Sequence, residues 1–484
     1  MNNEPALASQ PRMRWYQGMT GYQWWVICVG TLAWLMDTMS QRLFILSRAP
    51  ALKELLHDRL ATLDPVMTKA VVNQYGGYAT AAMMLGWAVG GFYFGIVGDK
   101  WGRAKTLSTS VLVYSIFTGL SGFSTAWWDF CIWRFLMGCG IGGAFATGAT
   151  LIAETVPTHS RAFALGLFQA LSAVGNIAAS AVAWKLVHPS TSYFQGTFGE
   201  EGLAGWRLLF FLGSVPAVLV VFIMATIREP QSWHDARRIA AADKLHRQMG
   251  DIKGMFTDPR WRRSTLVGVA LAVAGVVGLW GVGFWSPELI RQALPGADPE
   301  HVDKVIGGAT ALQDVGAFFG MFAFTLIATL IGRRVGFAVS FLAAFVVVSG
   351  VFLSLRAEWH AYVMLPLVGF VTLSVFGGYS IYFPEIYPTR LRSTGTAFCY
   401  NVARVLTAAI ILLGNPLQNA LRSAGIGEVF RWGAVILCCF YFLGVIALVW
   451  APETKDRPLP EDFADAGRPQ RVLQRVTEQD DGRR

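Results

Sequence analysis

Ionisable side chains stand inside several apolar stretches of this 484-residue sequence, and they are the residues best suited to chemistry. Asp37 and Arg42 lie in one such stretch, while Arg134, Asp314 and Arg404 lie in three others. A charged side chain at the centre of a lipid bilayer costs roughly 2.5–3.5 kcal/mol even on lenient insertion scales, so each needs a partner or a function. We therefore expect these five residues to bind protons or a charged solute.

Helical spacing predicts which of these charges meet. Asp37 lies about nine residues, and Arg134 about seven, from the same end of their predicted spans, which puts both roughly 10–14 Å below one surface at 1.5 Å per residue. Burial favours a protonated carboxyl group and a nearby cation favours a carboxylate, so a pair that separates can couple proton binding to movement. The alternative is a purely structural ion pair. Asp314 and Arg404 both fall near mid-membrane, so they could pair. We expect a site role, either as a second proton carrier or as a carboxylate anchor, and the alternative is a structural pair.

An internal repeat indicates how the chain is organised. The pattern E-x-x-P-T-x-x-R occurs at 154–161 and again 231 residues later at 385–392, and Gly-Arg occurs at 102–103 and 332–333. Two motifs with nearly one offset predict two homologous halves, the arrangement of transporters with a central midplane site. At this offset Asp314, Arg404, Asp37 and Arg134 correspond to Met83, Ala173, Gly268 and Leu365 in the other half, none of which is charged. The shared scaffold does not require the charges, so we expect each to serve a function.

Composition and hydropathy supply the elements that hold these residues. Hydrophobic residues make up 54% of the chain and charged residues 15%, with a mean hydropathy of +0.44, whereas soluble domains carry nearer a quarter charged residues. With about 20 apolar residues per spanning helix, we predict an all-α membrane protein of about twelve spanning helices, near 22–46, 73–98, 106–124, 127–153, 160–187, 205–226, 264–287, 305–331, 336–355, 361–387, 393–419 and 431–451. We expect six-helix halves at 1–226 and 264–451, a central loop at 227–263 and a tail at 452–484.

Charge distribution predicts the orientation. Lys and Arg concentrate around 100–105, 228–263 and 455–484, which the predicted spans place on one side of the membrane. The loops on the opposite side carry far fewer. This positive-inside pattern places both termini and the central loop in the cytoplasm, and the first apolar run reads as a retained span of a plasma or inner membrane protein. The net charge of +9 follows from that asymmetry, so we expect no nucleic-acid partner.

Catalytic and metal-binding patterns do not emerge from the sequence. The six cysteines fall inside predicted spans without metal-ligand spacing, the seven histidines are scattered, and a Walker motif is missing. We therefore expect no enzyme, no metal and no cofactor.

The segment 95–105, Gly-Ile-Val-Gly-Asp-Lys-Trp-Gly-Arg-Ala-Lys, resembles the loop between spans two and three of the major facilitator superfamily. The run 134–143 with its exit motif, the loops 228–233 and 452–455, and Gln169 resemble the sugar porters. That resemblance implies a proton-coupled pair like Asp37 with Arg134. However, 278–285 lacks the paired glutamines of sugar porters and 376–385 lacks their Pro-Trp element.

The segments 384–392 and 401–404 look more like organic-acid and aromatic-acid proton symporters. Two sets of further site residues are expected on this basis. A gate that bridges neighbouring helices is expected from Asp99, Arg103, Glu154, Arg161, Glu385 and Arg392. Because Thr329 stands where the repeat would place a second Asp99, we expect the stronger latch in the first half. Substrate contacts, for which the alternative is helix packing, are expected from Arg42, Gln169, Asn176, Trp280, Gln313, Tyr379, Tyr382, Asn401 and Arg404.

These features favour a secondary transporter that moves a small polar metabolite with a proton. An organic or aromatic acid would suit Arg42 or Arg404, and a sugar, the next choice, would suit Gln169 and the aromatic residues. Proton-driven efflux, a passive facilitator and a nutrient sensor of the same fold are the alternatives. The expected partners are a small-molecule substrate, protons and the lipid bilayer, and we expect a monomer.

Overall fold

The structure is a computed structural model, and it describes residues 14–186, 192–193, 202–242, 248–282, 285–412 and 414–461. Its first half contains α1 (Gly21–Leu55), α3 (Pro65–Trp101), α4 (Arg103–Ser121), α5 (Trp127–Thr155), α6 (Thr158–Leu186) and a sixth pass made of α7 (Gly205–Leu212) and α8 (Ala217–Thr226). The connections hold α2 (His57–Leu60) and a short antiparallel pairing of β1 (Ser192–Tyr193) with β2 (Leu203–Ala204).

The second half repeats this order. It contains α11 (Pro259–Val282), α13 (Pro299–Leu330), α14 (Arg333–Ser354), α15 (Glu358–Glu385), α16 (Arg392–Leu412) and a last pass made of α18 (Val429–Cys438) and α19 (Phe440–Ala447). Shorter elements lie in its connections, namely α12 (Ser286–Ala293), the 3-10 turn η2 (Thr389–Leu391) and α17 (Gly414–Ser423). Between the halves lie α9 (Gln231–Ala242) and α10 (Ile252–Thr257).

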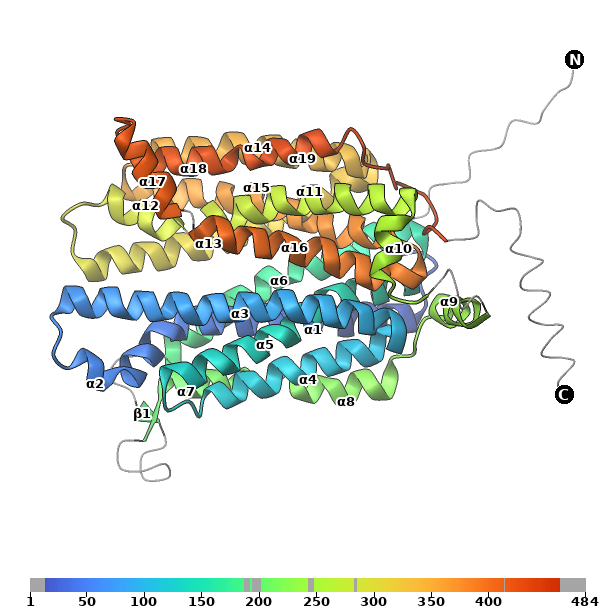
Figure 1. Ribbon diagram of the computed structural model, residues 1–484, viewed down its shortest axis with the longest axis horizontal. Coiled ribbons are helices and arrows are strands. Elements are labelled where there is room, and N and C mark those ends of the chain that lie inside the picture. Colours follow the sequence, from blue (N-terminus) through green and yellow to red (C-terminus); the bar gives the residue numbers. More distant parts are fainter. Residues whose placement is uncertain are drawn as a thin grey trace, which may run out of the picture.

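Twelve helical passes run side by side through the described part of the chain (Figure 1). Nine described helices are long and apolar enough to cross a membrane. The other three passes, α1, α4 and α16, carry more polar residues, and α1 and α16 hold the buried charges Asp37 and Arg404. The predicted all-α fold with twelve spanning helices is therefore confirmed.

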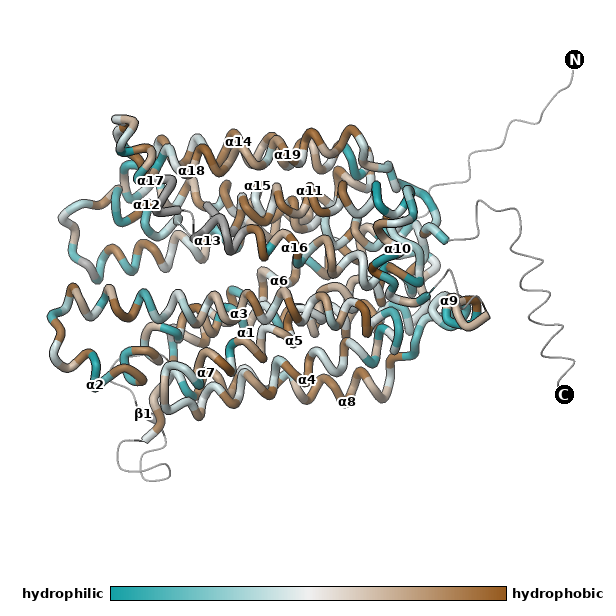
Figure 2. The backbone as a smooth tube through the Cα atoms, in the orientation of Figure 1, coloured by the Kyte–Doolittle hydropathy of each residue, from teal (hydrophilic) through white to brown (hydrophobic). Residues whose placement is uncertain are grey.

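Apolar side chains also cover the outside of the helix bundle, where Val221 and Val346 are 68% and 65% exposed. Figure 2 shows hydrophobic segments along the lengths of the helices and hydrophilic segments gathered at the two ends. An apolar belt with polar ends matches a bilayer, whose core cannot hydrate polar groups. We call the end that carries α9 and α10 the α9 end, and the opposite end, with α2, α12 and α17, the α2 end (Figure 1).

The internal repeat is visible in the helix packing. A Cβ atom on Gly86 or Gly90 would collide with the backbone of α5, and one on Gly316 or Gly320, each 230 residues later, would collide with the backbone of α15. Small residues at these positions let the helix backbones approach closely. The same helix pair therefore packs in the same way in each half. The boundaries at 226, 263 and 451 remain predictions.

Two glutamates from outside the bundle cap equivalent helices. Glu229 accepts hydrogen bonds from the first backbone N–H groups of α4, at Arg103, Ala104 and Lys105, at 2.6–3.2 Å. Glu453 does the same for α14, accepting from Arg333 and Arg334 at 3.0 and 3.1 Å. A carboxylate at a helix N-terminus satisfies free N–H groups and interacts favourably with the helix dipole.

A Glu453→Gln variant is expected to be less stable at neutral pH, by about 1 kcal/mol as for other N-cap losses. Partial burial raises the pKa of Glu453, but the backbone N–H groups that it accepts from outweigh burial and hold that pKa below its ordinary value. Such a group stabilises the fold fully above the unfolded-state pKa, and this contribution is lost as the pH falls through the lower folded-state pKa. Thermal unfolding in detergent should show a gap between wild type and variant that closes in acid. A gap independent of pH would contradict this account.

Candidate functional site

Each half carries one buried arginine–glutamate pair at the α9 end. Arg103 donates two hydrogen bonds to Glu154 at 3.0 and 2.9 Å, and Arg333 donates two to Glu385 at the same distances. The remaining Nη1 atoms donate to the backbone carbonyls of Gly98 and Ala328, again 230 residues apart. Fork-shaped pairs of this kind fix geometry as well as charge. The pairs tie the second pass of each half to its third and fourth.

Contacts across the two halves are concentrated on the first-half side of this cluster. Arg392 Nη1 lies 2.7 Å from Glu154 Oε1, which already binds Arg103. Asp99 accepts hydrogen bonds from the backbone N–H groups of Ser393 and Thr394 at 3.1 and 2.9 Å, and from the Thr394 hydroxyl at 2.6 Å. A residue of one half therefore caps α16 of the other, where free N–H groups carry partial positive charge.

The second half has no equivalent reach within the described residues. Thr329, at the position that corresponds to Asp99, donates its hydroxyl hydrogen to Thr325 of its own helix at 2.7 Å. Arg161 and Arg392 keep the repeat, since each Nε donates to a backbone carbonyl eight residues earlier, at 3.2 and 3.0 Å. The asymmetry expected from Thr329 is thus present in the geometry. All six expected gate residues lie in or beside this cluster.

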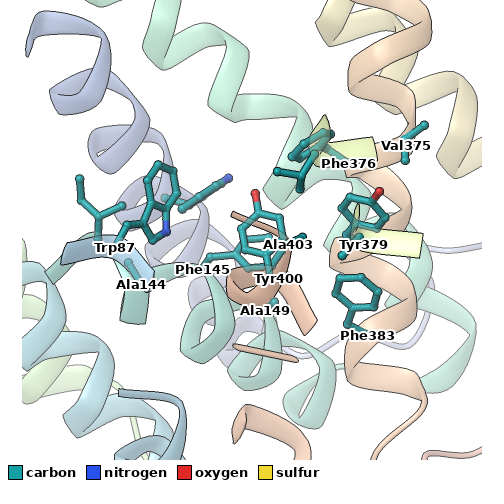
Figure 3. Packing of buried hydrophobic residues seen from close by; sticks show 14 of the residues in the cluster. Trp87, Ala144, Phe145, Ala149, Val375, Phe376, Tyr379, Phe383, Tyr400 and Ala403 are labelled. Carbon is teal, nitrogen blue, oxygen red and sulfur yellow. The ribbon is translucent and has the colours of Figure 1, made fainter. Parts of the chain in front are cut away.

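Nearer the middle of the bundle, Arg404 of α16 lies between two aromatic rings. Its guanidinium carbon is 3.8 Å from the ring centroids of both Trp87 and Tyr400, and Nη1 donates to the Tyr400 carbonyl at 3.1 Å. Figure 3 shows Tyr400 beside Phe145, whose ring stacks on it at 4.1 Å. Arg404 is only 1% exposed, yet its Nε has no hydrogen-bond partner among the described residues. A buried donor without an acceptor is costly unless a ligand supplies one.

Asp37 of α1 is the acid on which the charge of Arg404 acts. The carboxyl group is fully buried, and its Oδ2 accepts from Gln41 Nε2 at 3.2 Å. Its Oδ1 has no hydrogen-bond partner among the described residues, and no Lys or Arg nitrogen there forms a salt bridge with it. One half therefore holds an incompletely satisfied acid and the other an incompletely satisfied base.

A second pair of opposite charges crosses the halves, between α1 and α13. Arg42 Nη2 lies 3.5 Å from Asp314 Oδ2, with exposed side-chain fractions of 23% and 17%. On α6, the Ser180 hydroxyl accepts from Arg42 Nε at 3.4 Å, and Asn176 forms a side-chain hydrogen bond with Asp314. Asp314 Oδ2 has no hydrogen-bond partner in the described part of the chain. This pair is loosely held, and part of each side chain is exposed although Asp314 Oδ2 itself is buried.

The predicted pairing of Asp37 with Arg134 is wrong. Arg134 points away into a pocket of rings, with its guanidinium carbon 5.4, 5.6 and 4.6 Å from the ring centroids of Phe44, Phe130 and Phe210. Its Nη2 donates to Ser121 and to a backbone carbonyl of α4. The possible pairing of Asp314 with Arg404 is wrong as well, because the arginine beside Asp314 is Arg42, and the acid on which the charge of Arg404 acts is Asp37. Depth was estimated along the helices, but the direction of each side chain around its helix differs.

The weaker candidates for substrate contact divide into two groups. Gln169 and Asn401 are 3% and 1% exposed, and each has a side-chain oxygen without a partner in the described structure. Tyr379 instead donates to the Leu271 carbonyl at 2.6 Å, and Tyr382 donates to the Pro452 carbonyl at 2.8 Å.

Both tyrosine hydroxyls are therefore occupied by helix packing, and a substrate contact of either residue stays a prediction. The hydroxyl of Tyr379 joins α15 to α11, and that of Tyr382 joins α15 to the segment that follows α19. Gln313 is half-buried beside Asp314. The Trp280 side chain lies outside the described residues.

Sequence reasoning missed the residues that surround the buried charges. Trp87 and Tyr400 flank Arg404, Gln41 binds Asp37, and Thr394 binds Asp99. Tyr400 and Gln41 each lie four residues from a charge that was recognised, on the same face of one helix. Helical spacing alone was therefore enough to find these two, whereas Trp87 and Thr394 come from other helices.

Two six-helix bundles, a cluster of charged residues that joins them at one end and unsatisfied buried charges between the halves define a membrane transporter of the major facilitator fold. The protein belongs to the family described as sugar (and other) transporter, whose model matches residues 19–462.

Similar proteins agree with this assignment. The chain is 27% identical to a probable 4-methylmuconolactone transporter of Cupriavidus pinatubonensis over 91% of this chain and 93% of the relative. It is 27% identical to a cis,cis-muconate transport protein of Acinetobacter baylyi over 78% and 84%. The proton:xylose symporter XylE has a similar fold, with a TM-score of 0.69 and 18% identity over 90% of this chain and 98% of XylE.

Proposed function

We propose that this transporter takes up a small organic acid together with a proton, with Arg404 binding the substrate carboxylate and Asp37 taking the proton. One observation carries the proposal. Arg404 and Asp37 are both buried, come from opposite halves, and each keeps a polar atom without a hydrogen bond among the described residues. A substrate carboxylate would satisfy Arg404, and it would favour protonation of Asp37 by taking over its counter-charge.

The surroundings of Arg404 favour an acid with an unsaturated or aromatic body. Trp87, Phe145 and Tyr400 present ring faces around the guanidinium group. Such faces suit flat apolar groups, whereas a neutral sugar would leave the arginine charge without an acceptor. Two relatives are named as a probable 4-methylmuconolactone transporter and a cis,cis-muconate transport protein.

The orientation that we propose places the α9 end and both termini in the cytoplasm of an inner-membrane protein. Among the described residues, the basic central helices α9 and α10 and Lys455 lie at that end, as the positive-inside rule requires. The gate at the α9 end joins the halves, so the structure corresponds to a state closed to the cytoplasm. Because one chain supplies all the candidate contacts from its two halves, we propose a monomer as the transporting unit.

Purified protein in liposomes tests this function directly. We expect uptake of aromatic or unsaturated carboxylic acids that rises when the outside is made acidic, and little uptake of neutral sugars. Indifference of acid uptake to an imposed pH difference would contradict proton coupling. Preference for sugars over every acid would contradict the role of Arg404.

An Asp99→Ala variant is expected to open the α9 end more often. It removes three hydrogen bonds across the halves, and a single bond to a charged group contributes about 1.5–3 kcal/mol. Since 1.4 kcal/mol is a tenfold change in an equilibrium constant, an increase of about tenfold or more in the open population is expected.

Ser393→Cys, introduced at a buried position where Gly98 approaches α16, reports this opening through its rate of reaction with a hydrophilic maleimide. The exposed Cys28 and Cys439 are first replaced by Ser. Thr329→Ala is the matched control in the other half and should leave the rate unchanged. Equal rates in Asp99→Ala and in the parent protein would show that Asp99 is not a latch.

A further inference from the structure

Two acid–base couples cross between the halves in opposite senses. In one, the acid Asp37 comes from the first half and the base Arg404 from the second. In the other, the base Arg42 comes from the first half and the acid Asp314 from the second. Asp37 and Arg42 share α1 and lie five residues apart, which is about 7.5 Å along the axis at 1.5 Å per residue.

Arg42 has the character of a second carboxylate site. Its 3.5 Å contact with Asp314 is longer than a charge-assisted hydrogen bond, which is usually about 2.7–2.9 Å. The exposed fractions of 23% and 17% leave part of each side chain open, although Asp314 Oδ2 is itself buried, whereas Asp37 and Arg404 are almost fully buried. The neutral Asn176 and Ser180 add polar groups from α6. A ligand carboxylate with better geometry can therefore take the place of Asp314 on Arg42.

We propose that Arg42, Asp314, Asn176 and Ser180 form a second subsite, which binds the distal carboxylate of a short diacid while Arg404 binds the proximal one. This inference rests on the proposed function. Each substrate carboxylate takes over the positive charge that one aspartate experiences, and each of these aspartates then takes up one proton. Two negative charges then move with two protons, so that the transport step is electrically neutral.

The surroundings of the two aspartates fit this exchange. Arg42 from α1 is the charged group that faces Asp314 in the described structure, α6 contributes the neutral Asn176, and α15 meets this stretch of α13 through the backbone of Pro366 against Gly316. Around Asp37 the corresponding groups are Arg404, Gln41, Tyr114 and Tyr400. Among the described residues, neither aspartate has a second base beside it that would stabilise its negative charge once the substrate occupies the arginine.

The order of the two couples along α1 adds a direction. Arg42 lies further than Asp37 along α1 towards the α2 end, and the halves are joined at the α9 end by Asp99 and Glu154. A diacid that arrives from the α2 end meets Arg42 first. The exposed subsite then holds one carboxylate while the other reaches Arg404.

Accumulation measurements in liposomes test the proposal. The probes are linear diacids from butanedioate to octanedioate and their monomethyl esters, with the membrane voltage clamped to zero. For a pH difference of about one unit, one proton sustains about a tenfold concentration ratio and two protons about a hundredfold, because each pH unit contributes about 1.36 kcal/mol per proton. We expect about a hundredfold for the best diacid and about tenfold for its monoester.

Variants at the second subsite separate its role from folding. Arg42→Gln should raise the KM for the diacid about tenfold or more, and far more than it raises the KM for the monoester, while Asp64→Asn, at an exposed cap of α3, reports an otherwise intact protein. Arg42→Lys keeps the charge but loses the fork-shaped contact. Its KM for the diacid should therefore lie between those of wild type and Arg42→Gln. Asp314→Asn should lower the diacid ratio from about a hundredfold to about tenfold, through loss of one proton.

Three results would overturn the inference while leaving the proposed function intact. They are equal plateau ratios for diacid and monoester, equal effects of Arg42→Gln on both probes, and transport of monoesters without any diacid. Failure of every diacid, every monoester and the aromatic acids to accumulate would instead reject the proposed function, and the inference with it.

Discussion

An Asp37→Asn variant is expected to lose uphill accumulation of a monocarboxylic acid while it continues to exchange that acid across the membrane. With a pH difference of about one unit, the plateau ratio should fall from about ten to about one, because each pH unit contributes about 1.36 kcal/mol per coupled proton. Asn keeps the size of the side chain and can still bond to Gln41, which lies 3.2 Å from the carboxylate. It cannot take up a proton, so binding and movement continue without coupling.

Counterflow and net uptake in liposomes distinguish the two activities. Asp64→Asn is the matched control, because Asp64 is an exposed carboxylate that caps α3 and has no part in the buried couples. It should retain the full plateau ratio. Proton-driven accumulation by Asp37→Asn at the wild-type level would exclude Asp37 as the proton carrier, whereas loss of exchange together with accumulation would make it a structural residue.

Arg404→Gln is expected to weaken the binding of carboxylates by about 30-fold or more. Truncating one partner of a buried, hydrogen-bonded charge pair costs roughly 2–5 kcal/mol, and 1.4 kcal/mol is a tenfold change in affinity. The glutamine also leaves the space between Trp87 and Tyr400, whose ring centroids now lie 3.8 Å from the guanidinium carbon. Substrate affinity, measured by thermal shift or calorimetry on purified protein, should fall for each acid that is transported.

Arg404→Lys sharpens this measurement. Lysine keeps a positive charge but loses the planar group that stacks on rings and binds a carboxylate with two hydrogen bonds. We expect an affinity between those of wild type and Arg404→Gln. Arg134→Lys is the control, because Arg134 is equally buried among rings but belongs to neither couple. Unchanged carboxylate affinity in Arg404→Gln would exclude Arg404 as the anchor.

Local sequence was sufficient for much of the fold and for the residue types of the site. The twelve passes follow from apolar runs, since a bilayer accepts only segments whose backbone groups are satisfied within a helix. The repeat of Glu154–Arg161 at Glu385–Arg392 correctly indicated equivalent surroundings, which extend to the hydrogen bonds of Arg103 and Arg333. The different contacts of Asp99 and Thr329 followed from that single difference in sequence, and the stronger latch in the first half stays a prediction.

Tertiary structure alone decided which charges meet. Counting along helices gives the depth of Asp37 and Arg134, but contact also depends on the direction in which each side chain leaves its helix and on which helix lies there. Arg134 turns into the rings beside α4 and α7, while Asp37 turns towards α16 of the other half. The sequence thus determined that ionisable groups lie within helices long enough to cross a bilayer, because most of the residues around each of them are apolar. The packing of two bundles against each other determined their partners, because those partners come from helices far apart in the chain.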